Sequence, residues 1–372
     1  MSREVTDIFP LAFVVVGVSA AAWRHFVYLR KKAERQDTAW RAAASDLQGE
    51  FVPASGWFSK TPMSISAVAW GRRVIIDHYQ VGDGKSSTTF TRIQAAGEGP
   101  SDLSLTLREK GILSSIGKAL GAQDIALGDG PFDQRFAVKT SDEDLARAWL
   151  VPEVTGALFE ARPYSHELVA GGQVTSIRRD IENDDHALLR AAKACVLLAG
   201  RGAALRAEWR RLAQELHGVV VAEPWADPEP RLEIQERGTA VFIDLVRSES
   251  LPKPLRGRLL TSVWGRRPPG RVDHFVAAEK GTLRERDGAM VELEPALWDA
   301  IEVRSTGVSA TAARFDAEFI DSFAHARPVR VWGNEETVHV AFPGLLFDVA
   351  RLQSAVKIVA RLAAAVGDGP YR

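Results

Sequence analysis

Residues that could do chemistry are few and scattered in this sequence. The most suggestive run is Gly82-Asp83-Gly84-Lys85-Ser86-Ser87, whose end resembles a phosphate-binding loop. Such a loop needs a leading glycine, and that position holds Tyr79. It must also open a helix whose N-terminus faces the phosphate. Here the flanking segments alternate between apolar and polar residues, which predicts strands. The run is therefore predicted to be a hairpin loop and not a nucleotide site.

Nucleophile patterns are equally incomplete. Gly307-Val308-Ser309-Ala310-Thr311 approaches the nucleophile elbow of hydrolases but lacks its final glycine. His325 and His339 follow, yet no α/β-hydrolase order of strands surrounds them, so we interpret the run as a polar loop. The single cysteine, Cys195, lies in an apolar run and is predicted to be a small buried hydrophobe, not a reactive thiol.

Metal binding would need side chains that converge, and the eight histidines are spread along the chain with no pair at helical i, i+4 spacing. The tightest polar cluster is Glu182-Asn183-Asp184-Asp185-His186. Carboxylates at that density favour a helix N-terminus, where they cap free amides. We therefore nominate no catalytic, cofactor-binding or metal-binding residue, and we expect no cofactor.

One stretch is strongly basic and contains a tryptophan. Arginine beside an aromatic ring can bind anionic lipid, phosphate or nucleic acid. The alternative is a solvated hairpin whose charges are balanced by Glu249, Glu279 and Glu285. The candidate contacts for an anion or a partner are Arg256, Arg258, Trp264, Arg266, Arg267 and Arg271.

Composition limits the class of partner. The formal net charge is −1, so no overall field attracts nucleic acid, and we expect none as a partner. Hydrophobic residues make up 46% of the chain and charged residues 26%, which is typical of globular domains with a packed core.

The N-terminus is the clearest local signal. No charge occurs from Ile8 to Trp23, and a helix of that length spans about 24 Å, short of a bilayer core of about 30 Å. If Arg24 reaches toward the head groups, the helix can continue to Leu29 and become long enough. We predict a membrane anchor in residues 1–32, with its helix at about 8–29. A signal peptide cleaved near Ala22 and a buried soluble helix are the alternatives.

Cations indicate the orientation of this anchor. Arg3 alone precedes the apolar segment, whereas several cations follow it, so the positive-inside rule places the N-terminus outside and the body in the cytoplasm, at a bacterial inner membrane. Export after cleavage is the alternative. The candidate contacts for lipid head groups are Arg24, Arg30, Lys31 and Lys32.

The body consists of two related copies. The segments 40–49 and 209–218 match, each a helix with a tryptophan near its start and a closing glycine expected to adopt positive φ. Further matches follow in the same order at an offset near 169 residues, including Gly71 with Gly238 and Asp77 with Asp244. The shared aspartates are interpreted as turn residues, and the paired tryptophans, Trp40 with Trp209 and Trp57 with Trp225, as core residues. The predicted domains are 33–200 and 201–372, with a hinge at Gly200-Arg201-Gly202.

Periodicity predicts the elements of one copy. Short links between the strands exclude parallel crossovers, so each sheet is expected to be mainly antiparallel in an α+β fold with packed helices. The predicted helices are 37–48, 112–120, 142–159 and 184–199, and the predicted strands are 64–70, 74–79, 88–95, 101–108 and 135–139, with a hairpin at 168–178.

One stretch resembles a known class of domain. In Phe132 to Pro152 a strand with spaced phenylalanines runs into an acidic helix start, then a leucine and a proline. This is similar to a segment of bacterial membrane-anchored domains of unknown function. The resemblance implies no active site, and the second copy lacks the acidic start.

These observations favour a membrane-tethered, non-enzymatic binding or scaffold protein that holds a protein partner or anionic lipid. One alternative is a carrier that encloses an apolar ligand between a curved sheet and a helix. The other is an enzyme whose site is assembled from residues that the sequence does not associate.

Overall fold

The computed structural model describes residues 8–54, 62–82, 87–101, 103–110, 123–128, 130–226, 230–247, 257–268, 274–283, 289–291, 301–307 and 315–364, without the side chains of 8–22, 123, 124 and 170. The chain divides into two compact units, which we treat separately. Unit 1 comprises Met1–Gly97, Ser104–Lys139 and Pro152–Gly200, and unit 2 comprises Glu98–Leu103, Thr140–Val151 and Arg201–Arg372. The predicted domains differ from these units because two segments from the middle of the first copy belong to unit 2.

The first sheet has nine strands in the order β1-β2-β3-β4-β9-β8-β5-β7-β6. Its strands are β1 (Glu50–Val52), β2 (Ser64–Ala69), β3 (Arg72–Val81), β4 (Thr88–Ala95), β5 (Leu105–Glu109), β6 (Gln123–Ile125), β7 (Phe136–Thr140), β8 (Ser165–Leu168) and β9 (Val174–Arg179). The segment that resembles a phosphate loop joins β3 to β4, an antiparallel pair, although residues 83–86 lie outside the described chain.

The second sheet also has nine strands, in the order β10-β11-β12-β13-β18-β17-β14-β16-β15. Its strands are β10 (Val219–Ala222), β11 (Arg231–Glu236), β12 (Thr239–Arg247), β13 (Leu259–Arg266), β14 (Phe275–Glu279), β15 (Ala289–Met290), β16 (Ile301–Ser305), β17 (Arg330–Gly333) and β18 (Thr337–Pro343). Each strand takes the place of the strand nine numbers earlier in the first sheet. The α+β class with two antiparallel sheets is confirmed, and the two copies share one sheet topology.

Shared turns explain part of this common topology. The β2–β3 and β11–β12 hairpins turn at Trp70-Gly71 and Arg237-Gly238, where all four residues have positive φ. That geometry matches the right-handed twist of paired strands, and glycine adopts it without strain.

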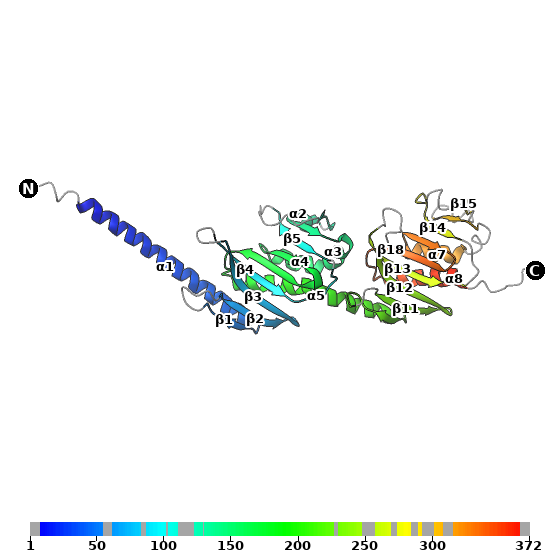
Figure 1. The fold of residues 1–372 in the computed structure, drawn as a ribbon, viewed down its shortest axis with the longest axis horizontal. Helices are drawn as coiled ribbons and strands as arrows, with labels where there is room; N and C mark the ends of the chain where they lie inside the picture. The colour runs from blue at the N-terminus through cyan, green and yellow to red at the C-terminus, as the bar shows by residue number, and fades with distance from the viewer. Residues whose placement is uncertain are drawn as a thin grey trace, which may run out of the picture. The chain divides into compact units, whose positions relative to one another are not determined.

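The helices are α1 (Ile8–Asp46), α2 (Gly130–Arg135), α3 (Glu143–Trp149), α4 (Pro152–Glu160), α5 (Asp185–Glu215), α7 (Ala317–Ala326) and α8 (Val349–Ala363), with a short 3₁₀ turn at Ala170–Gly172 (Figure 1). The single helix predicted over 142–159 is wrong, because the chain breaks between α3 and α4. Pro152 has no N–H to continue α3 and restricts the residue before it. Asp142 accepts a hydrogen bond from the N–H of Leu145, so the acidic start does cap α3.

The glycines that close the matched helices act differently from the prediction. Positive φ occurs one residue earlier, at Gln48 and His217. A Cβ on Gly49 would lie 2.7 Å from the Cβ of Ala67, and a Cβ on Gly218 would lie 2.8 Å from the carbonyl oxygen of Glu233. These glycines therefore allow the chain to approach β2 and β11 closely.

The predicted hinge at Gly200-Arg201-Gly202 is also wrong. These residues lie inside α5, which runs without a break from Asp185 to Glu215. A Cβ on Gly202 would overlap the carbonyl oxygen of Glu98, whereas a Cβ on Gly200 would meet only the side chain of Arg72, 3.3 Å from its Nε. Gly202 is thus a contact residue and not a flexible joint.

Gly202→Ala is expected to lower the free energy of unfolding by about 1–3 kcal/mol, because the helix and the Glu98 backbone must move apart. Gly200→Ala is the matched control. It gains helix propensity of about 1 kcal/mol and displaces only a flexible side chain. Urea unfolding of both variants checks the contrast, and equal effects at the two positions would refute a contact role for Gly202.

The N-terminal helix differs from the prediction in its extent. It continues past Leu29 to Asp46, and its C-terminal part, with Trp40 and Ala44 buried, packs on the first sheet. In the part of the chain whose side chains are described, no helix is both long enough and apolar enough to cross a bilayer. Most of the predicted transmembrane span falls in residues 8–22, whose side chains lie outside the described ones.

Candidate functional site: the open face of the second sheet

Alternation along the strands gives the second sheet two different faces. Val241, Ile243, Val263 and Val340 are fully buried on one of them, the core face. Helix α8 packs there, and Gly265 makes room for it, because a Cβ at this position would lie 2.9 Å from Cγ1 of Val359. The intervening residues point to the opposite side, which we call the open face. The functional site that we consider lies on this open face.

Four rings form a row across the open face, and we call Phe242, Trp264, His339 and Trp332 the ring row. Each is a direct cross-strand neighbour of the next, on β12, β13, β18 and β17 in turn. The centroid distances along the row are 4.6, 6.1 and 4.9 Å, and all three pairs are stacked. All four rings are half-buried. Stacked cross-strand rings stabilise a sheet and also present a continuous aromatic surface.

Asp244 anchors one side of this row. Its carboxylate accepts two hydrogen bonds from Arg231, each 2.9 Å long, and a third of 2.8 Å from the indole N–H of Trp264. The Arg231 guanidinium also lies 5.5 Å from the Trp264 ring centroid and 5.7 Å from that of Phe242. The prediction of a turn residue is wrong here, because Asp244 lies within β12 and is paired on both sides.

The first sheet has an equivalent ion pair, but its arginine comes from the strand on the other side of the aspartate. Asp77 accepts hydrogen bonds of 2.9 and 2.6 Å from Arg92, whose guanidinium lies 5.1 Å from the ring centroid of Tyr79. Arg92 comes from β4, whereas Arg231 comes from β11, the equivalent of β2. Ser262 holds the position in β13 that corresponds to Arg92. Both copies therefore keep the aspartate, an arginine and a stacked ring, although the arginine occupies a different neighbouring strand.

The ring row itself occurs in the second copy alone. The corresponding cross-strand positions of the first sheet are Ile75, Gln94, Thr175 and Glu167. Three of these four are polar, as expected for a sheet face in contact with water. The second sheet departs from that rule, and this departure distinguishes the copies.

Further apolar residues and arginines extend the open face. Val246 and Trp332 pack against Leu260. Arg231 and Arg330 stand on the next cross-strand line beside the rings, and Arg266 stands on the line at their other side. Arg266 is exposed. The face thus has an aromatic and aliphatic centre with arginines around it.

Burial controls the protonation of His339. Loss of hydration lowers the pKa of this imidazole to about 4, against a smaller opposite effect of Asp244. Its Nε2 lies 2.9 Å from the hydroxyl of Thr337, and its ring stacks on Trp332. The imidazole is therefore neutral near pH 7 and serves as a member of the stack.

His339→Gln is expected to weaken the acid sensitivity of unit 2. The imidazole binds a proton in the unfolded chain below about pH 6.5 but in the fold only near pH 4, so its contribution destabilises the fold as pH falls between these values. Urea unfolding across this interval should show a shallower decline in the variant than in the wild type. Parallel pH profiles would contradict the expected role of His339.

The comparisons with known proteins give little further help. No family model matches the chain, and no curated protein does. A solved structure with some similarity is the mycobacterial trehalose monomycolate transport factor A, TtfA. It is 17% identical, covers 42% of this chain and 93% of its own, and has a TM-score of 0.29. That score is too low to support any statement on fold or function.

The structure separates the residues predicted to contact an anion. Trp264 and Arg266 lie on the open face. Arg267 is buried, donates to the carbonyl oxygen of Asn334 and stacks 5.8 Å from the Phe275 ring centroid. Arg258 forms an ion pair with Asp144. Arg256 and Arg271 lie outside the described residues. The described residues of the basic stretch therefore do not form one cluster of cations.

The cations predicted to contact lipid head groups are exposed on α1. They are Arg24, Arg30, Lys31 and Lys32. Arg30 pairs with Glu34 at 2.9 Å. Trp23 and Tyr28 are also exposed, at 69% and 62%, so this helix presents large rings beside its cations.

Other sequence candidates have structural roles where they are described. Asp184 caps α5 by accepting from the N–H of Ala187, which confirms the predicted helix start. Cys195 is fully buried, and burial raises the pKa of its thiol to about 12, as expected for an unreactive core residue. Ser309 and Trp57 lie outside the described residues. Within the described chain, no three His, Cys, Asp or Glu side chains converge to hold a metal ion.

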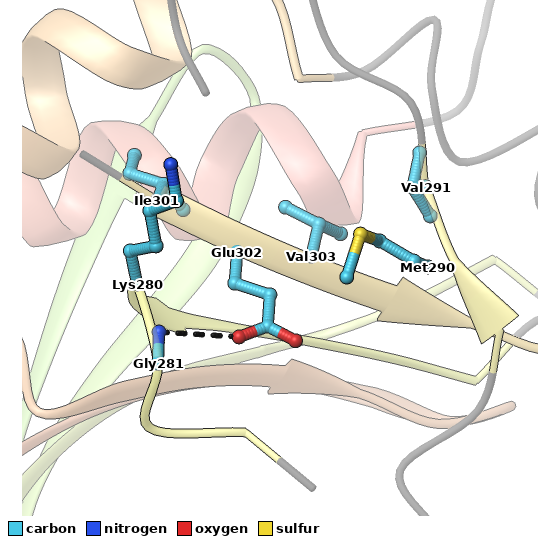
Figure 2. A pocket seen from close by; sticks show the side chains of 7 residues that line it. All are labelled: Lys280, Gly281, Met290, Val291, Ile301, Glu302 and Val303. Atoms are coloured by element: carbon cyan, nitrogen blue, oxygen red, sulfur yellow. Dashed lines mark hydrogen bonds between the residues drawn. The ribbon is translucent and has the colours of Figure 1, made fainter. Parts of the chain in front are cut away.

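A small pocket lies near β14, β15 and β16. Figure 2 shows Glu302 bonded to the backbone N–H of Gly281, at 3.2 Å, with Met290 and Val303 among the apolar lining. Its volume is about 250 Å³. Small-molecule sites usually enclose about 300–1,000 Å³, so this pocket is at most a small site for an apolar ligand.

Proposed function

We propose that this chain is a non-enzymatic binding or scaffold protein that engages a protein partner through the open face of its second sheet. The observation that carries this proposal is the ring row, which replaces polar residues of the equivalent first-copy face. Tryptophan and arginine are enriched among residues that dominate binding energy at interfaces. Because only the second of two similar sheets has this aromatic row, the two copies would differ in role, the first being structural and the second binding the partner.

The groups on this face favour binding over catalysis. Asp244 accepts from three donors, and His339 is neutral and held between aromatic rings. A general base works best with a pKa near the working pH, and burial lowers the pKa of His339 to about 4. These polar groups instead fix the positions of the rings, as expected for a preorganised recognition surface.

A membrane tether is the second part of the proposal. The uncharged run Ile8 to Trp23, followed by exposed rings and cations on α1, suits attachment at a bacterial inner membrane with the body on the cytoplasmic side. Membrane fractionation of the full chain against a version starting at Lys31 tests this part. A full chain that stays in the soluble fraction would refute the tether.

To test the binding role, residues of the ring row are replaced by the residues at the equivalent positions of the first copy. Trp264→Gln, His339→Thr and Trp332→Glu together place the three polar first-copy residues on the second sheet. Affinity capture from detergent extract should recover a partner with the wild type and lose it with this triple variant. Val68→Ser, at a position 74% exposed on the first sheet, is the control and should leave capture unchanged. Equal capture by all three proteins would refute a role for the ring row.

A further inference from the structure

The dimensions of the ring row indicate what kind of element covers it. The row spans three inter-strand steps of about 4.8 Å, or about 14 Å in all. Side chains at i, i+3 or i+4, i+7 and i+11 of a helix extend over a similar distance, about 16 Å at 1.5 Å per residue. Helices or a second sheet cover sheet faces in globular folds, whereas single extended strands add at edges. One amphipathic helix laid across the strands therefore fits the row.

The charges around the row indicate the chemistry of that helix. Arg231, Arg266 and Arg330 border the rings, against the carboxylates of Asp244 and Glu233. Asp244 is buried, and Arg231 and Trp264 hold its oxygens, so it offers little negative charge outward. Arg266 is exposed and is therefore the cation that a partner would meet. Carboxylates beside the apolar stripe of a partner would complement it, since such pairing steers and orients association.

We infer that the open face of the second sheet binds an acidic amphipathic helix, with the apolar side of the helix on Phe242, Trp264, His339 and Trp332 and its carboxylates near Arg266. This inference rests on the proposed binding function and adds the class of partner. It requires no change in the sheet, because the rings already stand in one fixed row.

Three synthetic peptides test the inference on the full chain in detergent. The first has leucines at i, i+3, i+7 and i+11 with flanking glutamates, the second replaces each glutamate with lysine, and the third scrambles the order of the first. Fluorescence anisotropy of labelled peptides measures affinity. The acidic helix should bind at least about tenfold more tightly than the lysine peptide, since like charges would then meet the arginines.

Variants locate the binding. The triple variant should bind the acidic peptide roughly 30-fold more weakly than the wild type does. This is the loss typical of a residue cluster that dominates an interface. Arg266→Glu alters an exposed side chain and leaves the rings intact. It should lower the affinity for the acidic peptide and raise the affinity for the lysine peptide. Arg73→Glu, at an exposed position of the first sheet, is the matched control and should alter neither affinity.

The outcomes separate this inference from the proposed function. If the lysine peptide or anionic vesicles bind in a way that depends on the ring row, the face is a binding surface but the acidic helix is wrong. If the acidic and scrambled peptides bind equally, the helical geometry is wrong. If no probe binds and partner capture also ignores the ring row, both the inference and the proposed function fail.

Discussion

Trp209→Ala is expected to lower the free energy of unfolding of unit 2 by about 3–5 kcal/mol, the usual loss for a large buried aromatic side chain. Trp209 is fully buried, its indole N–H donates to the carbonyl oxygen of Ala222 at 3.3 Å, and its ring meets Phe347 edge-on. Removal leaves a cavity beside α5 and an unpaired carbonyl on β10. Urea unfolding measures the loss, and hydrogen exchange should show it in the strands of the second sheet.

Trp209→Phe is the control for the hydrogen bond, since it keeps a ring and removes the N–H. It should cost less than alanine. Trp40 is the equivalent residue of unit 1, where its indole donates to the carbonyl oxygen of Glu182 at 3.0 Å, and Trp40→Ala should raise exchange in the first sheet. An alanine effect below about 1 kcal/mol at Trp209 would contradict the core role of the paired tryptophans.

In the core of unit 1, a single variant is expected to lower the free energy of unfolding, and a double variant at the same pair of residues is expected to raise it. His166 and Ser176 are buried cross-strand neighbours whose Nδ1 and Oγ atoms lie 2.6 Å apart. The Nε2 atom of His166 has no partner among the described residues, and burial lowers the pKa of this imidazole to about 3. Ser176→Ala alone should destabilise unit 1 by about 1–3 kcal/mol, because it leaves both ring nitrogens unpaired.

His166→Val with Ser176→Ala should reverse this effect and stabilise unit 1, by about 1–3 kcal/mol at neutral pH, because an apolar pair carries no desolvation penalty. The second copy supports that expectation, since it has Val331 and Val340 as the corresponding cross-strand pair. The gain should grow below pH 6.5, where the wild-type histidine binds a proton only in the unfolded chain. A double variant less stable than Ser176→Ala would overturn the expectation.

The sequence carried enough information for the class of the fold and for the hairpins at the start of each copy. Alternating residues predicted the strands from Ser64 to Ala95 closely, and the repeated glycines Gly71 and Gly238 marked equivalent hairpins. These signals are local, so they can be interpreted from the sequence without knowledge of distant contacts. The helix break at Pro152 was equally local, and the proline itself was the signal that the prediction of one helix over 142–159 left unused.

The open face depends on contacts between distant segments. Trp264 and His339 become neighbours only through the pairing of β13 with β18, and no spacing in the sequence announces that pair. Asp244 and Arg231 meet through the register of one hairpin, and a shift of one residue would place them on opposite faces. Glycine was ambiguous for a related reason. At Gly202 the missing Cβ lets the backbone of Glu98 approach α5 closely. The sequence alone cannot distinguish this role from flexibility.

The two copies bind their equivalent aspartates with arginines from different strands. Arg92 on β4 binds Asp77, whereas Arg231 on β11 binds Asp244, so the two copies share the position of the carboxylate but not that of the arginine. On the β13 side of Asp244 the second copy has Ser262, and Trp264 supplies a third donor to the carboxylate. Because either neighbouring strand can supply the arginine, the strand that does not supply it can carry other residues, as β13 does with Trp264.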